Sequence, residues 1–147
     1  MIAGKLICEE QLHAEDHIWL FIVLHGLVHL LYSGQSWRLF ELQPGMVWPA
    51  GSWAFSKLLG DEPTRLLASA LCILAAIGFV VGGTGISMKQ PWWRPTVVGA
   101  AAISALTFIL FWDRKNQGLD DQGGIGLLIN IALLVALGIF GWPDFEF

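Results

Sequence analysis

Charged residues are scarce in this chain. Of its 147 residues, 14% are Asp, Glu, Lys or Arg and 55% are hydrophobic, and the mean hydropathy is +0.62. Soluble domains carry about 25% charged and about 45–50% apolar residues, so much of this chain needs a solvent other than water. The composition excludes a disordered chain and a fibrous repeat, and it argues against a soluble enzyme.

Cysteines, basic clusters and nucleotide-binding motifs are also few or missing. The two cysteines are Cys8, in a polar lead-in, and Cys72, inside an apolar run, so a disulfide scaffold is excluded. The eight Lys and Arg residues are scattered among twelve Asp and Glu residues, which argues against nucleic acid as a partner. There is no Walker A loop, no G-x-S-x-G elbow and no C-x-x-C pair, so the chain carries no complete catalytic motif.

Four apolar segments are long enough to cross a bilayer as helices. A hydrocarbon core of ~30 Å needs about 20 apolar residues in a helix. The interiors of the four segments lack Asp, Glu, Lys and Arg, as the cost of burying charge in lipid requires. We predict an all-α, integral membrane four-helix bundle that forms a single membrane domain over residues 1–147. A polar lead-in over 1–17 precedes spans at about 18–37, 65–83, 95–112 and 124–141.

Tryptophans mark the ends of the predicted spans, where an amphipathic ring is most stable. Six of the eight fall at such ends: Trp19, Trp37, Trp92, Trp93, Trp112 and Trp142. The other two, Trp48 and Trp53, lie in the connection between spans one and two. Residues 48–60 there predict a short helix capped by Ser52 that lies flat at the interface. Alternatively, this segment folds back over the mouth of the bundle as a lid; we favour the flat arrangement.

Small residues recur four positions apart inside the later spans. The pairs are Gly78 and Gly82, Ala101 and Ala105, and Ala132 and Ala136. Such spacing lets helix backbones approach closely, either within one bundle or against a partner, and the pattern does not separate the two.

The Lys and Arg residues of the loops predict an orientation. One side of the membrane carries Arg38, Lys57, Arg65, Arg114 and Lys115, and the other carries Lys5, Lys89 and Arg94. We predict a multi-pass protein of the plasma membrane with both termini on the non-cytoplasmic side.

Polar side chains inside the first span form a stripe on one helix face. His25, His29 and Tyr32 follow one another at helical spacing, and a polar stripe on a membrane helix faces the bundle interior. Asn130 lies just inside the fourth span, at a depth that matches His29, and Ser104 approaches the same half of the membrane. We predict a small polar ligand-binding site that opens toward the 48–60 segment and is lined by His25, His29, Tyr32, Thr107 and Asn130.

Four roles fit this polar stripe. The side chains could bond one another and hold the helices together, bind a lipid or a quinone, hold a metal or haem, or transfer protons. Two histidines four residues apart supply only two ligands where zinc takes four, and they cannot bind haem iron from opposite faces, so we predict no metal site. The pattern specifies no cofactor.

A second histidine cluster precedes the first span. His13 and His17 flank Glu15 and Asp16, an arrangement that could bind a metal ion from solvent. Acidic residues are also typical of the solvated first turns of a helix, and we favour that interpretation.

Several short motifs resemble a group of small four-span prokaryotic membrane proteins similar to the DoxX-like family. The resemblance runs from about His25 to Leu134 and rests on four stretches: His25-Gly26-Leu27-Val28-His29-Leu30, Trp48-Pro49-Ala50-Gly51-Ser52-Trp53, Trp92-Trp93-Arg94-Pro95 and Phe111-Trp112-Asp113. It implies a four-helix bundle and an association with quinone-linked redox systems. Members are often labelled transporter permeases, although four spans without a nucleotide site make a poor transporter alone.

The sequence therefore predicts a non-catalytic accessory or scaffold subunit of a larger membrane complex, associated with quinone or electron transfer. The alternative is a membrane-embedded protein that binds or acts on a lipid or quinone through the polar site. A transporter component that requires oligomerisation is the third. The expected partners are the lipid bilayer and other membrane subunits or further copies of this chain.

Overall fold

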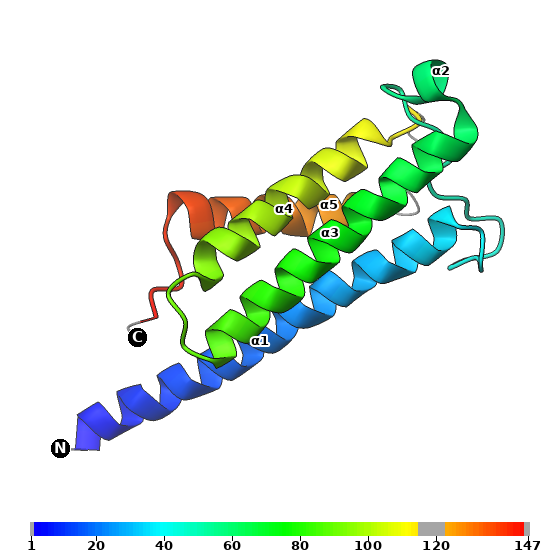
Figure 1. Cartoon of the computed structure of the whole chain (residues 1–147). Helices are drawn as coiled ribbons and strands as arrows, with labels where there is room; N and C mark the ends of the chain where they lie inside the picture. Colours follow the sequence, from blue (N-terminus) through cyan, green and yellow to red (C-terminus); the bar gives the residue numbers. More distant parts are fainter. Residues whose placement is uncertain (1, 115–122, 146–147) are drawn as a thin grey trace.

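The computed structural model describes residues 2–114 and 123–145, and all regular structure in that part of the chain is helical. Three helices are long: α1 (Ile2–Ser36), α3 (Asp61–Ser87) and α4 (Trp93–Leu110). Three elements are shorter: α2 (Ser56–Leu59), α5 (Gly124–Leu133) and the π-helix η1 (Leu134–Ile139). Figure 1 shows α3 between α1 and α4, with α5 running behind them. The all-α prediction is confirmed for this part of the chain.

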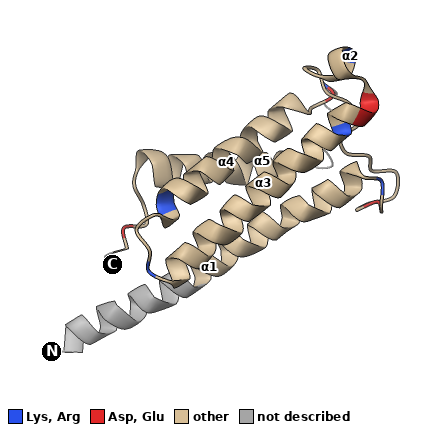
Figure 2. Cartoon of the chain, viewed as in Figure 1, with Lys and Arg blue, Asp and Glu red and all other residues tan. Residues whose placement is uncertain are grey.

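Three helices are long and apolar enough to cross a membrane: α3, α4 and residues His17–Ser36 of α1. Lys, Arg, Asp and Glu in the described part gather at the two ends of the bundle and leave its middle uncharged (Figure 2). The predicted fourth span is helical but shorter than expected. Its ten α-helical and six π-helical residues extend roughly 24 Å, less than a ~30 Å hydrocarbon core.

Helices α1 and α3 are longer than the first and second predicted spans, to which they correspond. The lead-in over 1–17 continues the helix of the first span, because α1 begins at Ile2. The sequence predicts that Gly82 and Gly83 end the second span, but α3 continues to Ser87. Gly82 packs against Val97 of α4 and Gly83 against Val23 of α1, so contacts with both neighbours outweigh the low helix propensity of glycine.

The small residues of α3 bring the described helices close together. A Cβ atom at Gly78 would lie 2.8 Å from the Cβ of Ala100, and one at Gly82 would lie 2.5 Å from Cγ2 of Val97. The Gly78 and Gly82 pair therefore serves packing between α3 and α4 of the same chain. A Cβ atom at Gly26 of α1 would lie 2.7 Å from the Cβ of Phe79, which marks the corresponding close approach of α1 to α3.

The segment between α1 and α3 packs onto the end of the bundle, and its helix is shorter than predicted. Only Ser56–Leu59 is α-helical, and Trp48 is fully buried between Tyr32 and Phe108. The Ser52 hydroxyl donates to the carbonyl of Leu110, and the indole of Trp53 donates to that of Ile109. Ser52 Oγ also accepts hydrogen bonds from the backbone amides of Ala54 and Phe55, in the turn that precedes α2. The N-cap of α2 itself is Phe55, so the predicted cap at Ser52 lies in this turn and not at the start of the helix.

Two tryptophans are core residues, although the sequence predicts Trp93 at a membrane interface and Trp48 in the connection between spans. Trp93 opens α4 and is buried in the main apolar cluster with Phe79 and Val97. Trp48 belongs to a second cluster that includes Phe108 and Phe111. A tryptophan ring can cover one end of a helix bundle or lie at the lipid interface. Trp48 and Trp93 cover the ends of this bundle.

Candidate functional site

The histidine stripe of α1 meets α4 and α5 in the middle of the bundle. His25 and His29 lie one turn apart on α1, Ser104 lies in α4 and Asn130 in α5. All four side chains are buried, and those of Ser104 and Asn130 are completely so. The structure places three of the predicted site residues, His25, His29 and Asn130, close together, with Asn130 bonded to His25.

Short hydrogen bonds join these four side chains. His25 Nε2 lies 2.9 Å from Asn130 Oδ1, and Asn130 Nδ2 donates to Ser104 Oγ over 2.6 Å. Ser104 Oγ lies 2.6 Å from His29 Nε2, and His29 Nδ1 lies 2.9 Å from the backbone carbonyl oxygen of His25. The bonds thus run from the His25 side chain through α5 and α4 and return to the His25 backbone. We call these four residues the polar circuit.

The direction of every bond in the polar circuit follows from two neutral imidazoles. A backbone carbonyl only accepts, so His29 Nδ1 carries the hydrogen and Nε2 keeps its lone pair. The Ser104 hydroxyl therefore donates to His29 Nε2, and it accepts from the Asn130 amide. The Asn130 oxygen accepts in turn, so His25 carries its hydrogen on Nε2.

Aromatic rings enclose the polar circuit. The Phe79 ring centroid lies 4.9 Å from that of His25 and 5.3 Å from that of His29, and Phe108 covers His29 from α4. In so apolar a setting an unsatisfied polar group is costly, and here each of the four side chains bonds another member of the circuit. The arrangement is suited to holding three helices in register.

The other two predicted site residues, Thr107 and Tyr32, lie beside the polar circuit. The Thr107 hydroxyl donates to the carbonyl of Ile103, four residues earlier in the same helix. The Tyr32 ring packs edge-on against Trp48 and Phe108, beneath the segment that covers the bundle end. Ser104, which the sequence places at the right depth but which the predicted site did not include, is instead the centre of the circuit. Ser104 could have been included from the sequence, because it lies three residues before Thr107 and therefore on nearly the same face of α4.

The end of α1 carries a second group of polar contacts. Gln35 Nε2 donates to the carbonyl of Met46, and the Arg38 guanidinium donates to those of Trp48 and Pro49. A pocket of about 240 Å³ lies here and is lined by Gln35, Arg38, Phe40, Glu41, Met46 and Val47. Partial burial lowers the pKa of Arg38, the charge of Arg65 lowers it further, and Asp61 opposes both effects.

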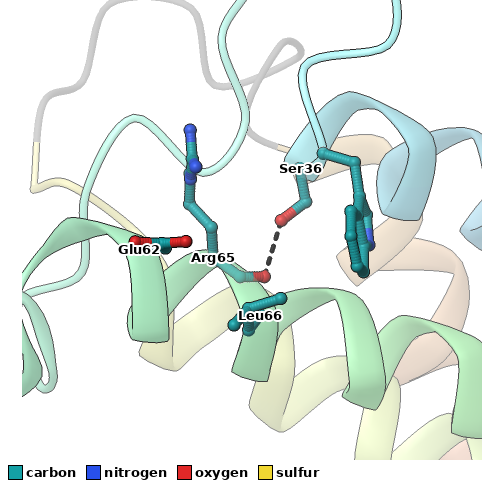
Figure 3. Close-up of a pocket in the computed structure, with 5 residues that line it drawn as sticks. Ser36, Glu62, Arg65 and Leu66 are labelled. Atoms are coloured by element: carbon teal, nitrogen blue, oxygen red, sulfur yellow. Dashed lines mark hydrogen bonds between the residues drawn. The ribbon is translucent and has the colours of Figure 1, made fainter.

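A smaller pocket separates the end of α1 from the start of α3 (Figure 3). The Ser36 hydroxyl donates to the backbone carbonyl of Arg65 over 2.7 Å and so ties the two helices together. The volume is about 80 Å³, well below the roughly 300–1,000 Å³ of a small-molecule site. The hydrogen bond at this pocket holds α1 and α3 together.

The described part of the chain contains no cluster of three or more His, Cys, Asp or Glu side chains placed to hold a metal ion. The side chains of His13, Glu15 and Asp16, which belong to the cluster before the first span, lie outside the described residues. No family model, curated protein or solved structure matches this chain. Its function is therefore inferred from the physical features of the chain itself.

Proposed function

We propose that this chain is a multi-pass plasma-membrane protein that serves as a non-catalytic accessory or scaffold subunit of a larger membrane complex. The observation that carries the proposal is the polar circuit, in which His25, His29, Ser104 and Asn130 bond one another. Polar groups that satisfy one another between helices stabilise a bundle and leave little capacity to bind or transform a substrate. The quinone or electron-transfer association and the kinship with DoxX-like proteins belong to this proposal and rest on the short sequence motifs that resemble that family.

Four crossings with both termini on one side form part of the proposal. Gly126, at the start of α5, lies against the Phe108 ring near the end of α4. Arg94, in the first turn of α4, donates to the carbonyl of Pro143, beyond the π-helix. The chain after Gly124 therefore runs back along α4, which supports a fourth crossing despite its shorter helix. The Lys and Arg distribution supports placing the termini on the non-cytoplasmic side.

The outer surfaces of the helices are where subunits or lipid would contact the chain. Only 28% of the most apolar window of α1 is buried, compared with 44% in α3 and in α4. Leu24 of α1 and Leu128 of α5 are 53% and 68% exposed, so each presents an apolar surface outward. A subunit interface on one of these helices would cover such surface.

Native mass spectrometry of the protein purified in mild detergent tests the proposal. We expect the chain to co-purify with other polypeptides, or with further copies of itself, at a fixed stoichiometry. Leu24→Trp and Leu128→Trp then locate the contact, because the variant on the partner-facing helix loses the partner while the other retains it. A chain that elutes alone with one stoichiometric lipid or quinone would contradict the accessory role.

A ligand site at the polar circuit is the competing proposal, and it requires a ligand to replace bonds that the four side chains already make. His29→Ala tests it, since the variant removes the imidazole that such a ligand would contact. If the folding yield falls while the bound lipid and quinone content is unchanged, the histidine has a structural role. If a stoichiometric ligand disappears from a folded variant, the ligand-binding alternative is favoured.

A further inference from the structure

A cavity of about 230 Å³ lies where the start of α4 meets the C-terminal segment. Its lining residues are Pro91, Trp93, Arg94, Pro95, Asp144 and Phe145. The cavity is at the opposite end of α4 from the 48–60 segment, and it is separate from the polar circuit. Among the described residues, it brings together one guanidinium and one carboxylate.

The Arg94 guanidinium is only partly satisfied within the chain. Nη2 donates to the carbonyl of Pro143 over 2.7 Å, whereas Nε is buried without a hydrogen-bond partner. The guanidinium carbon lies 5.4 Å from the centroid of the Trp93 ring, which supports the cation from one face. Because Nε is shielded, a phosphate would bind Arg94 through the N–H donors on Nη1 and Nη2, which lie in the plane of the guanidinium.

Asp144 supplies the opposite charge at the mouth of the cavity. Its carboxylate oxygen lies 3.5 Å from Arg94 Nη2, and its side chain is 88% exposed. The Arg94 side chain is 31% exposed. Because the carboxylate is in solvent, the ion pair contributes little stability, and the carboxylate and the exposed part of the guanidinium remain available to a ligand. A ligand carrying both charges could replace the pair without leaving either group alone.

The location of the cavity on α4 defines the ligand class. This inference rests on the proposed membrane location: if α4 crosses the bilayer, Arg94 in its first turn lies at the level of the lipid headgroups, beside Trp92 and Trp93. A lipid phosphate would meet Arg94 there, and a positively charged headgroup would meet Asp144. An anionic headgroup without an ammonium would be repelled by Asp144.

We propose that this cavity binds the headgroup of a zwitterionic aminophospholipid, with the phosphate on Arg94 and the primary ammonium on Asp144. A primary ammonium donates hydrogen bonds to a carboxylate, whereas a quaternary ammonium has no N–H to donate. The Trp93 ring that could hold a quaternary ammonium is already occupied by Arg94. Phosphatidylethanolamine therefore fits the cavity better than phosphatidylcholine or phosphatidylglycerol.

The test is lipid binding by the delipidated full chain, measured by native mass spectrometry during titration with each of these three phospholipids. We expect phosphatidylethanolamine to bind about 10-fold more tightly than the other two, as one additional charge-assisted hydrogen bond would provide. Arg94→Gln should weaken all three lipids. Asp144→Asn removes only an exposed carboxylate, and it should abolish the preference for phosphatidylethanolamine over phosphatidylglycerol while the fold remains intact.

Arg114→Gln is the matched control, because Arg114 also stacks over a tryptophan, Trp53, but lies at the opposite end of α4 from the cavity. It should leave lipid binding unchanged. Equal binding of the three phospholipids, or an Asp144→Asn variant that keeps the full preference, would overturn the inference. Competition by soluble phosphoethanolamine as effective as the lipid itself would overturn the lipid assignment.

The failure of this inference can be told apart from failure of the proposed function. A chain that does not insert into nanodiscs of the same lipids contradicts the membrane location on which both depend. A chain that inserts and binds its protein partners, but shows no headgroup preference, contradicts only the lipid site.

Discussion

Ser104 bonds both His29 and Asn130 through one hydroxyl, so it is the residue on which the polar circuit depends most. In Ser104→Ala a lone pair on His29 and an amide hydrogen on Asn130 lose their partners inside an apolar bundle. We expect the free energy of unfolding to fall by about 1–3 kcal/mol, the cost of leaving buried polar groups unsatisfied. Thermal unfolding in detergent, followed by circular dichroism, measures the change.

Thr107→Val is the matched control for this substitution. Its hydroxyl is as deeply buried in the same helix but bonds only the carbonyl of Ile103, and valine keeps the side-chain shape. We expect a loss of less than about 1 kcal/mol, because no interhelical partner is left unsatisfied. Equal losses in the two variants would show that α4 tolerates the removal of either hydroxyl and that the polar circuit does not hold the helices together.

The directions of the bonds predict two different histidine tautomers. His25 carries its hydrogen on Nε2, facing Asn130, whereas His29 carries it on Nδ1, facing a backbone carbonyl. Nitrogen chemical shifts of histidine-labelled protein distinguish the two forms. We expect one signal of each kind from the buried pair, and Ser104→Ala should change the Nε2 shift of His29 most. Two Nε2-protonated rings would contradict these bond directions.

At the scale of single residues, the sequence predicted the unusual side chains and missed an ordinary one. Histidine and asparagine in an apolar span need partners, so His25, His29 and Asn130 could be assigned to one site. A serine or threonine can instead bond a carbonyl of its own helix, as Thr107 does and Ser104 does not. The choice depends on how α4 is rotated against α1 and α5, which no local pattern records.

At the scale of helices, alanine substitutions at one glycine of α3 and one of α4 are expected to change the stability of the protein in opposite directions. A Cβ at Gly82 would lie 2.5 Å from Cγ2 of Val97 and 3.2 Å from its backbone nitrogen, whereas one at Gly99 meets nothing within 4 Å. Gly82→Ala should therefore force α3 and α4 apart and destabilise the protein by about 1–3 kcal/mol. Gly99→Ala should stabilise it by about 0.5–1 kcal/mol through helix propensity.

Thermal unfolding of the two variants side by side gives the measurement, and each is the control for the other. A stabilising effect of Gly82→Ala would show that α3 and α4 are not held in such close contact. No change from Gly99→Ala would leave the contact intact, but would show that alanine gains nothing at an open position of this helix.

Helix positions followed from hydropathy, whereas the ends of helices and the role of the connection did not. Long apolar runs without charge predicted α1, α3 and α4 because lipid selects for them regardless of tertiary contacts. The extension of α3 to Ser87 and the burial of Trp48 depend on neighbouring helices. A tryptophan in a connection packs inward or faces the headgroups according to the surface available to it, and the sequence alone does not describe that surface.

At the scale of the whole molecule, the distribution of charge and the course of the chain make the number of crossings testable. Lys57 follows α1, Lys89 follows α3 and Arg114 follows α4. If these three helices cross the membrane, Lys57 and Arg114 lie on one side and Lys89 lies on the other. Asp144 follows the short helical segment formed by α5 and η1, and its ion pair with Arg94 lies at the first turn of α4. With four crossings Asp144 shares a side with Lys89, and with three it shares a side with Arg114.

Cysteine labelling in intact cells separates these cases. Single cysteines are introduced as Lys57→Cys, Lys89→Cys, Arg114→Cys and Asp144→Cys into a chain whose native cysteines are replaced, and a membrane-impermeant maleimide is added from outside. We expect Lys89→Cys and Asp144→Cys to react, as both positions lie on the predicted non-cytoplasmic side, and the other two to react only after permeabilisation. The reverse labelling pattern would show that the termini lie on the cytoplasmic side and that the chain still crosses the membrane four times. If Asp144→Cys and Arg114→Cys are labelled under the same conditions, the two positions lie on one side of the membrane. The segment Gly124–Ile139, roughly 24 Å long, would then not cross.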